Sequence, residues 1–162
     1  MILNIMDTNL YHLRASIKLT PVWHEQAPNI VVSFNNNILY TGGLYETTTF
    51  SIDSLFSTGT YKLIVEFNNK TDNDSQYGLD KAVIIEQIIL NNITDPKFVW
   101  EGVYTPTYPK LWALQQEQQG ITLQPQLKQH NYLGWNGKWV LTFDIPVFTW
   151  IHKTQSLGWI YD

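Results

Sequence analysis

Residues 10–19, with the sequence LYHLRASIKL, decide the fold class because apolar and polar side chains alternate along them. One face carries Leu13, Ala15, Ile17 and Leu19. The other face carries Arg14, Ser16 and Lys18. A period of two is typical of a β-strand that buries one face, so we predict a half-buried strand here.

Further runs of strand-forming residues follow, at Asn29–Phe34 and at residues 38–41, 47–52, 61–67 and 83–90. Three asparagines at residues 35–37 join the first two runs, and asparagine tolerates the left-handed turn conformations of a hairpin. Short strands separated by turns at intervals of about 8–12 residues are typical of a β-sandwich. We therefore predict an all-β, β-dominated protein with a jelly-roll β-sandwich over residues 1–94.

The chain changes character near residue 95. Of its seven tryptophans, Trp23 alone precedes residue 99. Residues 1–96 hold five basic and ten acidic side chains, whereas residues 97–162 hold five basic and four acidic ones. We therefore predict that residues 95–162 form a separate, aromatic-rich docking region appended to the sandwich.

Two local signals predict the structure of this second region. Pro109 and Gly120 bracket the run LWALQQEQQ, and proline at the start with glycine after the end is typical of a short helix. The pair Asn136-Gly137 lies between strand-forming residues and predicts a β-hairpin. After it, apolar side chains alternate on one face of a strand, at Trp139, Leu141, Phe143 and Ile145.

Composition excludes several functional classes. The sequence has no cysteine, which rules out disulfides, thiolate metal sites and a cysteine nucleophile. The net charge is −4 and basic residues do not cluster, so we expect no nucleic-acid partner. The first residues lack the pattern of a signal peptide, and no apolar run is long enough to span a bilayer, so we expect no membrane partner and no export by the chain's own signal.

Catalytic motifs are also missing, and we expect no enzyme. The four histidines are scattered, and neither a G-x-S-x-G elbow nor a glycine-rich phosphate loop is present. The remaining alternative is a glycan-active enzyme fragment, because Glu25 and Glu46 adjoin the aromatic residues Trp23 and Tyr45. A glycosidase needs two carboxyl groups that face each other at about 5–9.5 Å, so these two glutamates are the pair to test.

Residues 68–80 form the one segment with obvious ligand chemistry. Calcium takes about six to eight oxygen ligands, and the segment could supply several from Asn68, Asp72, Asp74 and Asp80. It is not an EF-hand, because counting from Asp72 places Val83 where the twelfth residue should be a glutamate. A solvated turn is the alternative, since such residues satisfy their own backbone locally.

The stretch YKLIVEFNNK, followed by LDKAVIIEQIILNNI, resembles the last hairpin of the small calcium-dependent, xylan-binding carbohydrate-binding modules. The matching positions are Asn68, Asp80, Lys81, Glu86, Leu90 and Asn91. The sequence departs from the family pattern at Asn69, where the family has aspartate, and at Ala82, where it often has asparagine. The resemblance implies a jelly-roll fold and calcium-dependent glycan binding. For this interpretation we expect Trp23, Tyr45 and Tyr77 to be the ligand-binding aromatics.

The segments NYLGWNGKWVLTFDIPVFTWIHKTQSLGWIYD and VWEGVYTPTYPKLW are similar to structural proteins of tailed bacteriophages. This resemblance implies a virion structural protein, such as a capsid-decorating, neck or tail component, assembled in the host cytoplasm. Such a subunit would dock on other virion proteins through an apolar surface. The residues expected to form that surface are Trp150, Ile151, Trp159, Ile160 and Tyr161. We predict this role first, with a glycan-binding, receptor-recognising module as the alternative.

Overall fold

The computed structural model describes residues 9–155 of the chain. Its strands are β1 Leu10–Val22, β2 Asn29–Phe34, β3 Asn37–Gly43, β4 Thr48–Ser57, β5 Gly59–Phe67, β6 Ala82–Leu90, β7 Ile93–Thr94, β8 Val103–Pro106, β9 Leu127–Lys128, β10 Tyr132–Leu133 and β11 Gly137–Ile145. Its helices are the 3-10 turn η2 Asp72–Ser75 and the α-helices α1 Lys97–Trp100, α2 Lys110–Gln118 and α3 Val147–Gln155. Among the helices of residues 9–155, none is long and apolar enough to cross a membrane.

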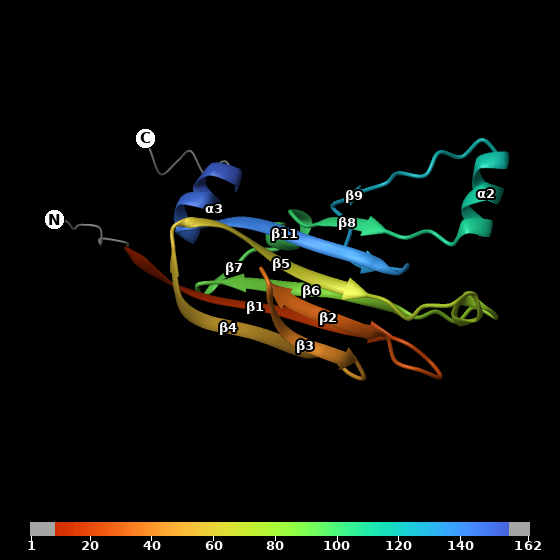
Figure 1. Cartoon of the computed structure of the whole chain (residues 1–162), viewed down its shortest axis with the longest axis horizontal. Helices are drawn as coiled ribbons and strands as arrows, with labels where there is room; N and C mark the ends of the chain where they lie inside the picture. Colours follow the sequence, from red (N-terminus) through yellow and green to blue (C-terminus); the bar gives the residue numbers. More distant parts are fainter. Residues whose placement is uncertain (1–8, 156–162) are drawn as a thin grey trace.

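The strands form two antiparallel sheets that face each other, which confirms the predicted β-sandwich (Figure 1). One sheet has the order β10-β6-β1-β4, with β7 also paired to β6. The other has the order β3-β2-β5-β11-β8-β9. Long strands lie at the middle of each sheet, so the core runs along the length of the molecule.

Strand β1 buries the face that the alternation of apolar and polar residues predicts to be buried. Its apolar face, from Leu13 to Leu19, is at most 2% exposed and packs in the core between the sheets. In the opposite sheet, β11 does the same with Trp139, Leu141, Phe143 and Ile145, which are at most 1% exposed. Each fully buried side chain of this size stabilises the fold by about 1.5–3 kcal/mol, so these two strands hold the sandwich together.

The division into a sandwich at residues 1–94 and a docking region at residues 95–162 differs from the structure. Strand β11 pairs along its whole length with β5, from Gly137 opposite Phe67 to Ile145 opposite Gly59. Strand β10 meanwhile pairs with β6 in the other sheet. Both parts of the chain contribute to one core. Without β11 the second sheet would lose the inner strand that joins β5 to β8, so the second region completes the sandwich.

The predicted hairpin at Asn136-Gly137 is wrong, whereas the predicted helix is confirmed. The strands on either side of Asn136-Gly137 belong to different sheets, so this pair crosses from one sheet to the other. Gly137 has φ +149°, and a Cβ there would lie 2.3 Å from the Thr105 carbonyl oxygen, so close packing explains the glycine. Helix α2 ends at Gln118, and Gly120, just past its end as expected, adopts φ +78°.

Helix α3 covers one end of the sandwich and corrects the expected docking surface. Trp150 and Ile151 are each only 5% exposed. The Trp150 ring packs 6.0 Å from Phe98 and 5.9 Å from Phe143, between ring centroids. Both apolar side chains are therefore used by the chain's own core and are not left for another protein. The other expected docking residues, Trp159, Ile160 and Tyr161, lie outside the described residues.

Candidate functional site

An open groove of about 670 Å³ lies at the end of the sandwich where the 68–81 loop approaches helix α2. Figure 1 shows both segments at the same end of the molecule, beyond the strands. Aromatic side chains that line the groove are Trp112, His130, Tyr132 and Trp135. Polar side chains that line it are Lys70, Thr71, Asp72, Ser75, Asp80, Thr107 and Asn136. The groove thus has the mixed apolar and polar lining that is typical of small-molecule sites.

The aromatic wall consists of rings that hold one another in place. Trp112 lies 5.5 Å from Trp135, between ring centroids, and Tyr108 lies 5.8 Å from Trp112 and 5.1 Å from Trp135. Helix α2 has no buried residue, and its Trp112 ring packs on Tyr108 and Trp135. Trp112 and Trp135 are both only partly buried, which leaves part of each ring open to the groove.

Tyr104 fixes the backbone of Trp135. Its hydroxyl accepts a hydrogen bond from the Trp135 amide at 2.9 Å and donates one to the Trp135 carbonyl. Burial raises the pKa of Tyr104, so the hydroxyl stays protonated and can serve as donor and acceptor at once. The Tyr104 ring also stacks on His130, with centroids 5.5 Å apart. The backbone of Trp135 is thus held in place by strand β8.

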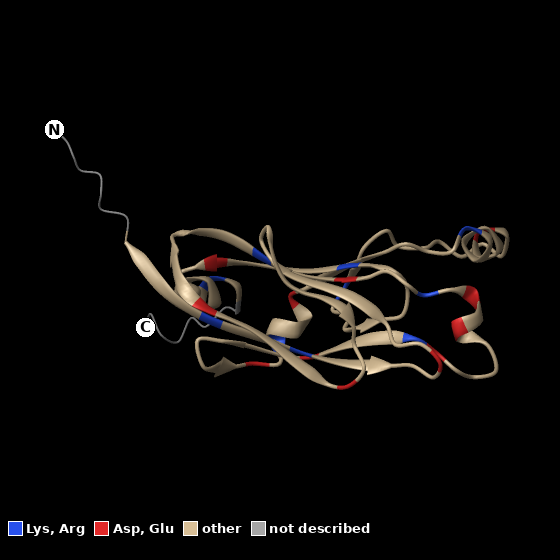
Figure 2. Cartoon of the chain, turned by 60° about the horizontal axis from the view of Figure 1, so that its bottom comes forward, with Lys and Arg blue, Asp and Glu red and all other residues tan. Residues whose placement is uncertain are grey.

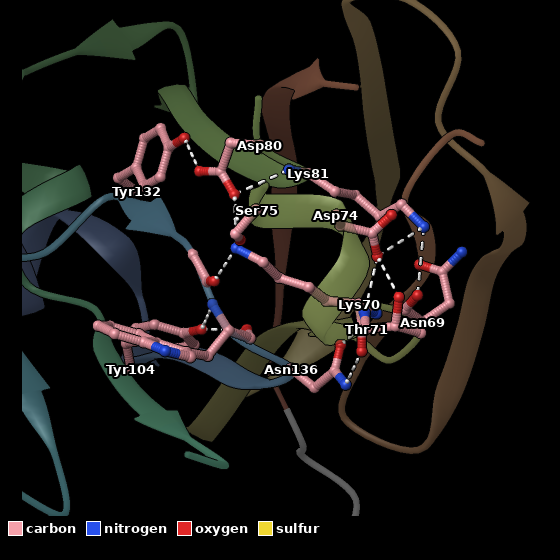
Figure 3. A network of polar contacts seen from close by, with 12 residues as sticks. Asn69, Lys70, Thr71, Asp74, Ser75, Asp80, Lys81, Tyr104, Tyr132 and Asn136 are labelled. Carbon is pink, nitrogen blue, oxygen red and sulfur yellow. Dashed lines mark hydrogen bonds and ion pairs between the residues drawn. The ribbon is translucent and has the colours of Figure 1, made fainter. Parts of the chain in front are cut away.

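Asn136 clamps the 68–81 loop to the other wall of the groove. The Lys70 amide donates to the Asn136 Oδ1 at 2.8 Å, and the Asn136 Nδ2 donates to the Lys70 carbonyl at 3.1 Å (Figure 3). One side chain therefore satisfies both backbone groups of a residue 66 positions away in the sequence. This pairing links the loop to the crossing between β10 and β11.

Lys70 continues the link through its ammonium group. Its Nζ donates to the Asp80 Oδ1 and to the Gly134 carbonyl, both at 2.5 Å. The other carboxylate oxygen of Asp80 accepts from the Tyr132 hydroxyl at 2.5 Å. Burial tends to raise the pKa of Asp80, but the bonds from Lys70 and Tyr132 outweigh it and the pKa is lowered. Asp80 is therefore ionised at neutral pH and orients the Tyr132 ring at the groove.

Lys81 lies behind the loop and is only 2% exposed. Its Nζ lies 3.3 Å from the Asp74 Oδ2, 3.2 Å from the Asn69 carbonyl and 3.4 Å from the Gln26 Oε1. Asp74 also accepts from the Thr71 amide at 2.7 Å. Burial tends to raise the pKa of Asp74, but these contacts outweigh it and the pKa is lowered. Figure 2 shows this mixture of charges, with acidic and basic segments adjoining around η2.

The four expected calcium ligands do not form one donor set in this structure. Asn68 accepts from the Asn29 side chain at 3.0 Å, Asp74 pairs with Lys81, and Asp80 pairs with Lys70. Asp72 is exposed and lines the groove. Within residues 9–155, no three His, Asp or Glu side chains gather as they would around a metal ion. As placed, the donors do not fit the oxygen cage of a calcium ion.

A second, smaller hollow of about 450 Å³ contains two of the three expected ligand-binding aromatics. Trp23 and Tyr45 meet edge to face there, with centroids 6.0 Å apart, and the Trp23 Nε1 donates to the Tyr45 carbonyl at 3.2 Å. Tyr77 is 95% exposed and lines neither hollow. Glu25 lines the hollow and Glu46 does not; the pair belongs to the enzyme alternative, against which we predict no catalysis.

The residues of the main groove that the sequence did not single out come mostly from the second region. These are Trp112, His130, Tyr132, Trp135 and Asn136. The available signal was the concentration of tryptophan after residue 99. That signal indicates an aromatic surface, but it does not show that the surface faces a loop more than 30 residues earlier in the chain.

No protein-family profile matches the sequence, and a comparison with curated proteins gives no match. Two solved structures are similar. One is described as "vCBM60 in complex with galactobiose", with a TM-score of 0.49 and 14% identity over 79% of this chain and 96% of that chain. The other is the SeMet form of vCBM60, whose description reads "Circular permutation provides an evolutionary link between two families of calcium-dependent carbohydrate binding modules". It has a TM-score of 0.49 and 14% identity over 80% of this chain and 89% of that chain.

Proposed function

We propose that this chain binds a neutral oligosaccharide in the groove between the 68–81 loop and helix α2. The observation that carries the proposal is the pair of partly exposed rings, Trp112 and Trp135, which share one open groove with hydroxyl, carboxylate and amide groups. The proposal keeps the glycan-binding alternative but assigns the binding to Trp112 and Trp135, which the sequence analysis did not propose as ligand-binding residues.

Sugars present two kinds of surface that this groove complements. The C–H groups on the face of a pyranose ring stack on indole and phenol rings, which carry negative charge on their faces. The groove offers such faces from Trp112 and Trp135. Because Tyr104 holds the Trp135 backbone and the Tyr108 and Trp112 rings pack on its ring, Trp135 needs little further ordering when a ligand binds, which favours affinity.

The hydroxyl groups of a sugar need donors and acceptors at the groove rim. Asp72, Thr71, Ser75 and Thr107 provide both kinds of group. The charged pair of Lys70 and Asp80 is internally neutral, which leaves the exposed Asp72 as the one acidic side chain of the lining without a lysine partner in the structure. The groove therefore favours a neutral ligand over a polyanion.

The test is calorimetric titration with a panel of neutral oligosaccharides that includes xylohexaose, comparing the wild type with Trp112→Ala. Because helix α2 buries no residue, this variant should stay folded. We expect at least a tenfold loss of affinity, equivalent to about 1.4 kcal/mol. The matched control is Trp100→Ala, whose ring is 42% exposed and lies outside the groove, and its affinity should equal that of the wild type. Equal affinities for wild type and Trp112→Ala would contradict the proposal.

Two further functional predictions, the virion role and the absence of catalysis, remain predictions. The virion role predicted for the aromatic C-terminal part stays a prediction, because Trp159, Ile160 and Tyr161 lie outside the described residues while Trp150 and Ile151 are buried. The absence of catalysis also stays a prediction. It is tested by incubating the chain with the oligosaccharides that it binds and looking for shorter products.

A further inference from the structure

The 68–81 loop contains two lysine ammonium groups, each surrounded by oxygen atoms. Around Lys81 these are a carboxylate, a backbone carbonyl and a side-chain amide oxygen, from Asp74, Asn69 and Gln26. An ammonium group has three donors and no acceptor, so three oxygens satisfy it fully. Since Lys81 is 2% exposed, this cation is held almost entirely by protein atoms.

Lys70 has a similar environment nearer to the groove. Its ammonium group lies 2.5 Å from a carboxylate oxygen of Asp80 and 2.5 Å from the Gly134 carbonyl. The Lys70 side chain is 13% exposed and that of Asp80 is 30% exposed. Asp80 thus directs one oxygen at Lys70 and the other at Tyr132 (Figure 3). Both carboxylate oxygens are engaged in contacts that shape the groove wall.

From this geometry we infer that Lys70 and Lys81 occupy the cation positions of the loop, so that it is organised without calcium. The two lysines balance the charges of Asp74 and Asp80. A divalent ion bound to either carboxylate would have to displace a buried ammonium group or lie beside it. Displacement leaves a buried cation unpaired, and proximity adds repulsion between like charges in a poorly screened site.

The inference rests on the proposed function for its consequence at the groove. Lys70 joins the loop to Gly134, and Asp80 orients Tyr132, so the ammonium group sets the distance between two walls of the groove. Oligosaccharide binding should therefore be independent of calcium and dependent on Lys70. This differs from the calcium dependence that the sequence resemblance implies.

The first experiment needs no sugar. We compare the melting temperature of the wild-type chain in millimolar calcium and in excess chelator, and we titrate terbium as a luminescent calcium substitute. A bound metal would raise the melting temperature by mass action, and terbium near Tyr132 or Trp135 would show sensitised emission. We expect equal melting temperatures and no saturable emission. A calcium-dependent rise, or saturable emission that calcium competes away, would overturn the inference.

The second experiment uses Lys70→Met, which keeps most of the aliphatic chain and removes the charge. We expect a lower melting temperature and at least a tenfold loss of oligosaccharide affinity in calcium and in chelator alike. The control is Lys18→Met on the exposed face of β1, which should match the wild type. Wild-type stability and affinity in Lys70→Met would overturn the inference.

The two proposals can fail separately. A wild-type chain that binds no oligosaccharide contradicts the proposed function, while the melting and terbium measurements still decide whether the loop takes a metal. Conversely, a chain that binds oligosaccharide only with calcium supports the proposed function and overturns the lysine inference.

Discussion

The middle of the sandwich and the groove end are held together by different kinds of contact. In the middle, the buried faces of β1 and β11 are apolar and at most 2% exposed. At the groove end, a few polar side chains bond to the backbone of distant segments, as Asn136 does to Lys70 and Tyr104 does to Trp135. We therefore expect the middle to supply most of the free energy of unfolding, whereas the shape of the groove depends on a small number of directed hydrogen bonds.

The tightness of the two regions also differs. In the middle, a Cβ added at Gly102 would lie 2.1 Å from the Trp139 ring, so neighbouring residues leave no spare space. At the groove end, a Cβ at Gly78 or Gly120 would meet nothing within 4 Å. The tips of the 68–81 loop and of helix α2 are therefore loosely packed, whereas Gly137, beside Asn136, is packed as tightly as Gly102.

The largest effect should come from the middle. Trp139→Ala removes a fully buried indole and leaves a cavity, which should lower the free energy of unfolding by about 3–5 kcal/mol. Urea denaturation measures it, with Trp100→Ala as the partly exposed control that should change stability far less. An equal loss in the free energy of unfolding for both variants would contradict the claim that the middle of the sandwich supplies most of the stability.

An intermediate effect should come from the clamp at the groove. Asn136→Ala leaves the amide and carbonyl of Lys70 without their partners, which should cost about 1–3 kcal/mol. Oligosaccharide affinity should fall as well, because the loop is no longer tied to the β10–β11 crossing. The control is Asn73→Ala in η2, an exposed residue of the same type, and it should leave stability and affinity near wild type. Loss of stability without loss of affinity would show that the clamp does not shape the groove.

The smallest effect concerns pH and the Lys70–Asp80 pair. The pKa of Asp80 is lowered from its ordinary 3.8, so its stabilising effect is complete above that pH and is lost as the pH falls through the lowered value. Asp80→Asn should therefore melt below the wild type at neutral pH, and the gap should narrow in acid. Thermal melts of both chains across this range test it, with Glu86→Gln, an exposed carboxylate of β6, as the control. A gap that stays constant below pH 3.8 would show that the charge of Asp80 is not responsible.

Much of the fold could be predicted from local pattern. The alternation in residues 10–19 and 139–145 identified buried strand faces, and Gly120 marked the end of a helix. The Asn136-Gly137 pair predicted a hairpin turn that does not form. Its glycine is instead required because the backbone of residue 137 lies close to the Thr105 carbonyl. We expected Trp150 on a docking surface because it lies in an apolar C-terminal segment. Helix α3 instead places its ring against Phe98 in the chain's own core.

Local sequence pattern is enough to predict which side chains are buried along β1 and β11, because side-chain direction in a strand has a fixed period of two. It also determined that the 68–81 loop is polar and that aromatics gather after residue 99. That β11 pairs with β5, and that Asn136 meets Lys70 of that loop, is visible only in the folded chain. Strand partners and cross-chain hydrogen bonds join residues far apart in sequence, and no local period records them. For the same reason, the pairing of Asp80 with Lys70 and of Asp74 with Lys81 is seen only in the structure.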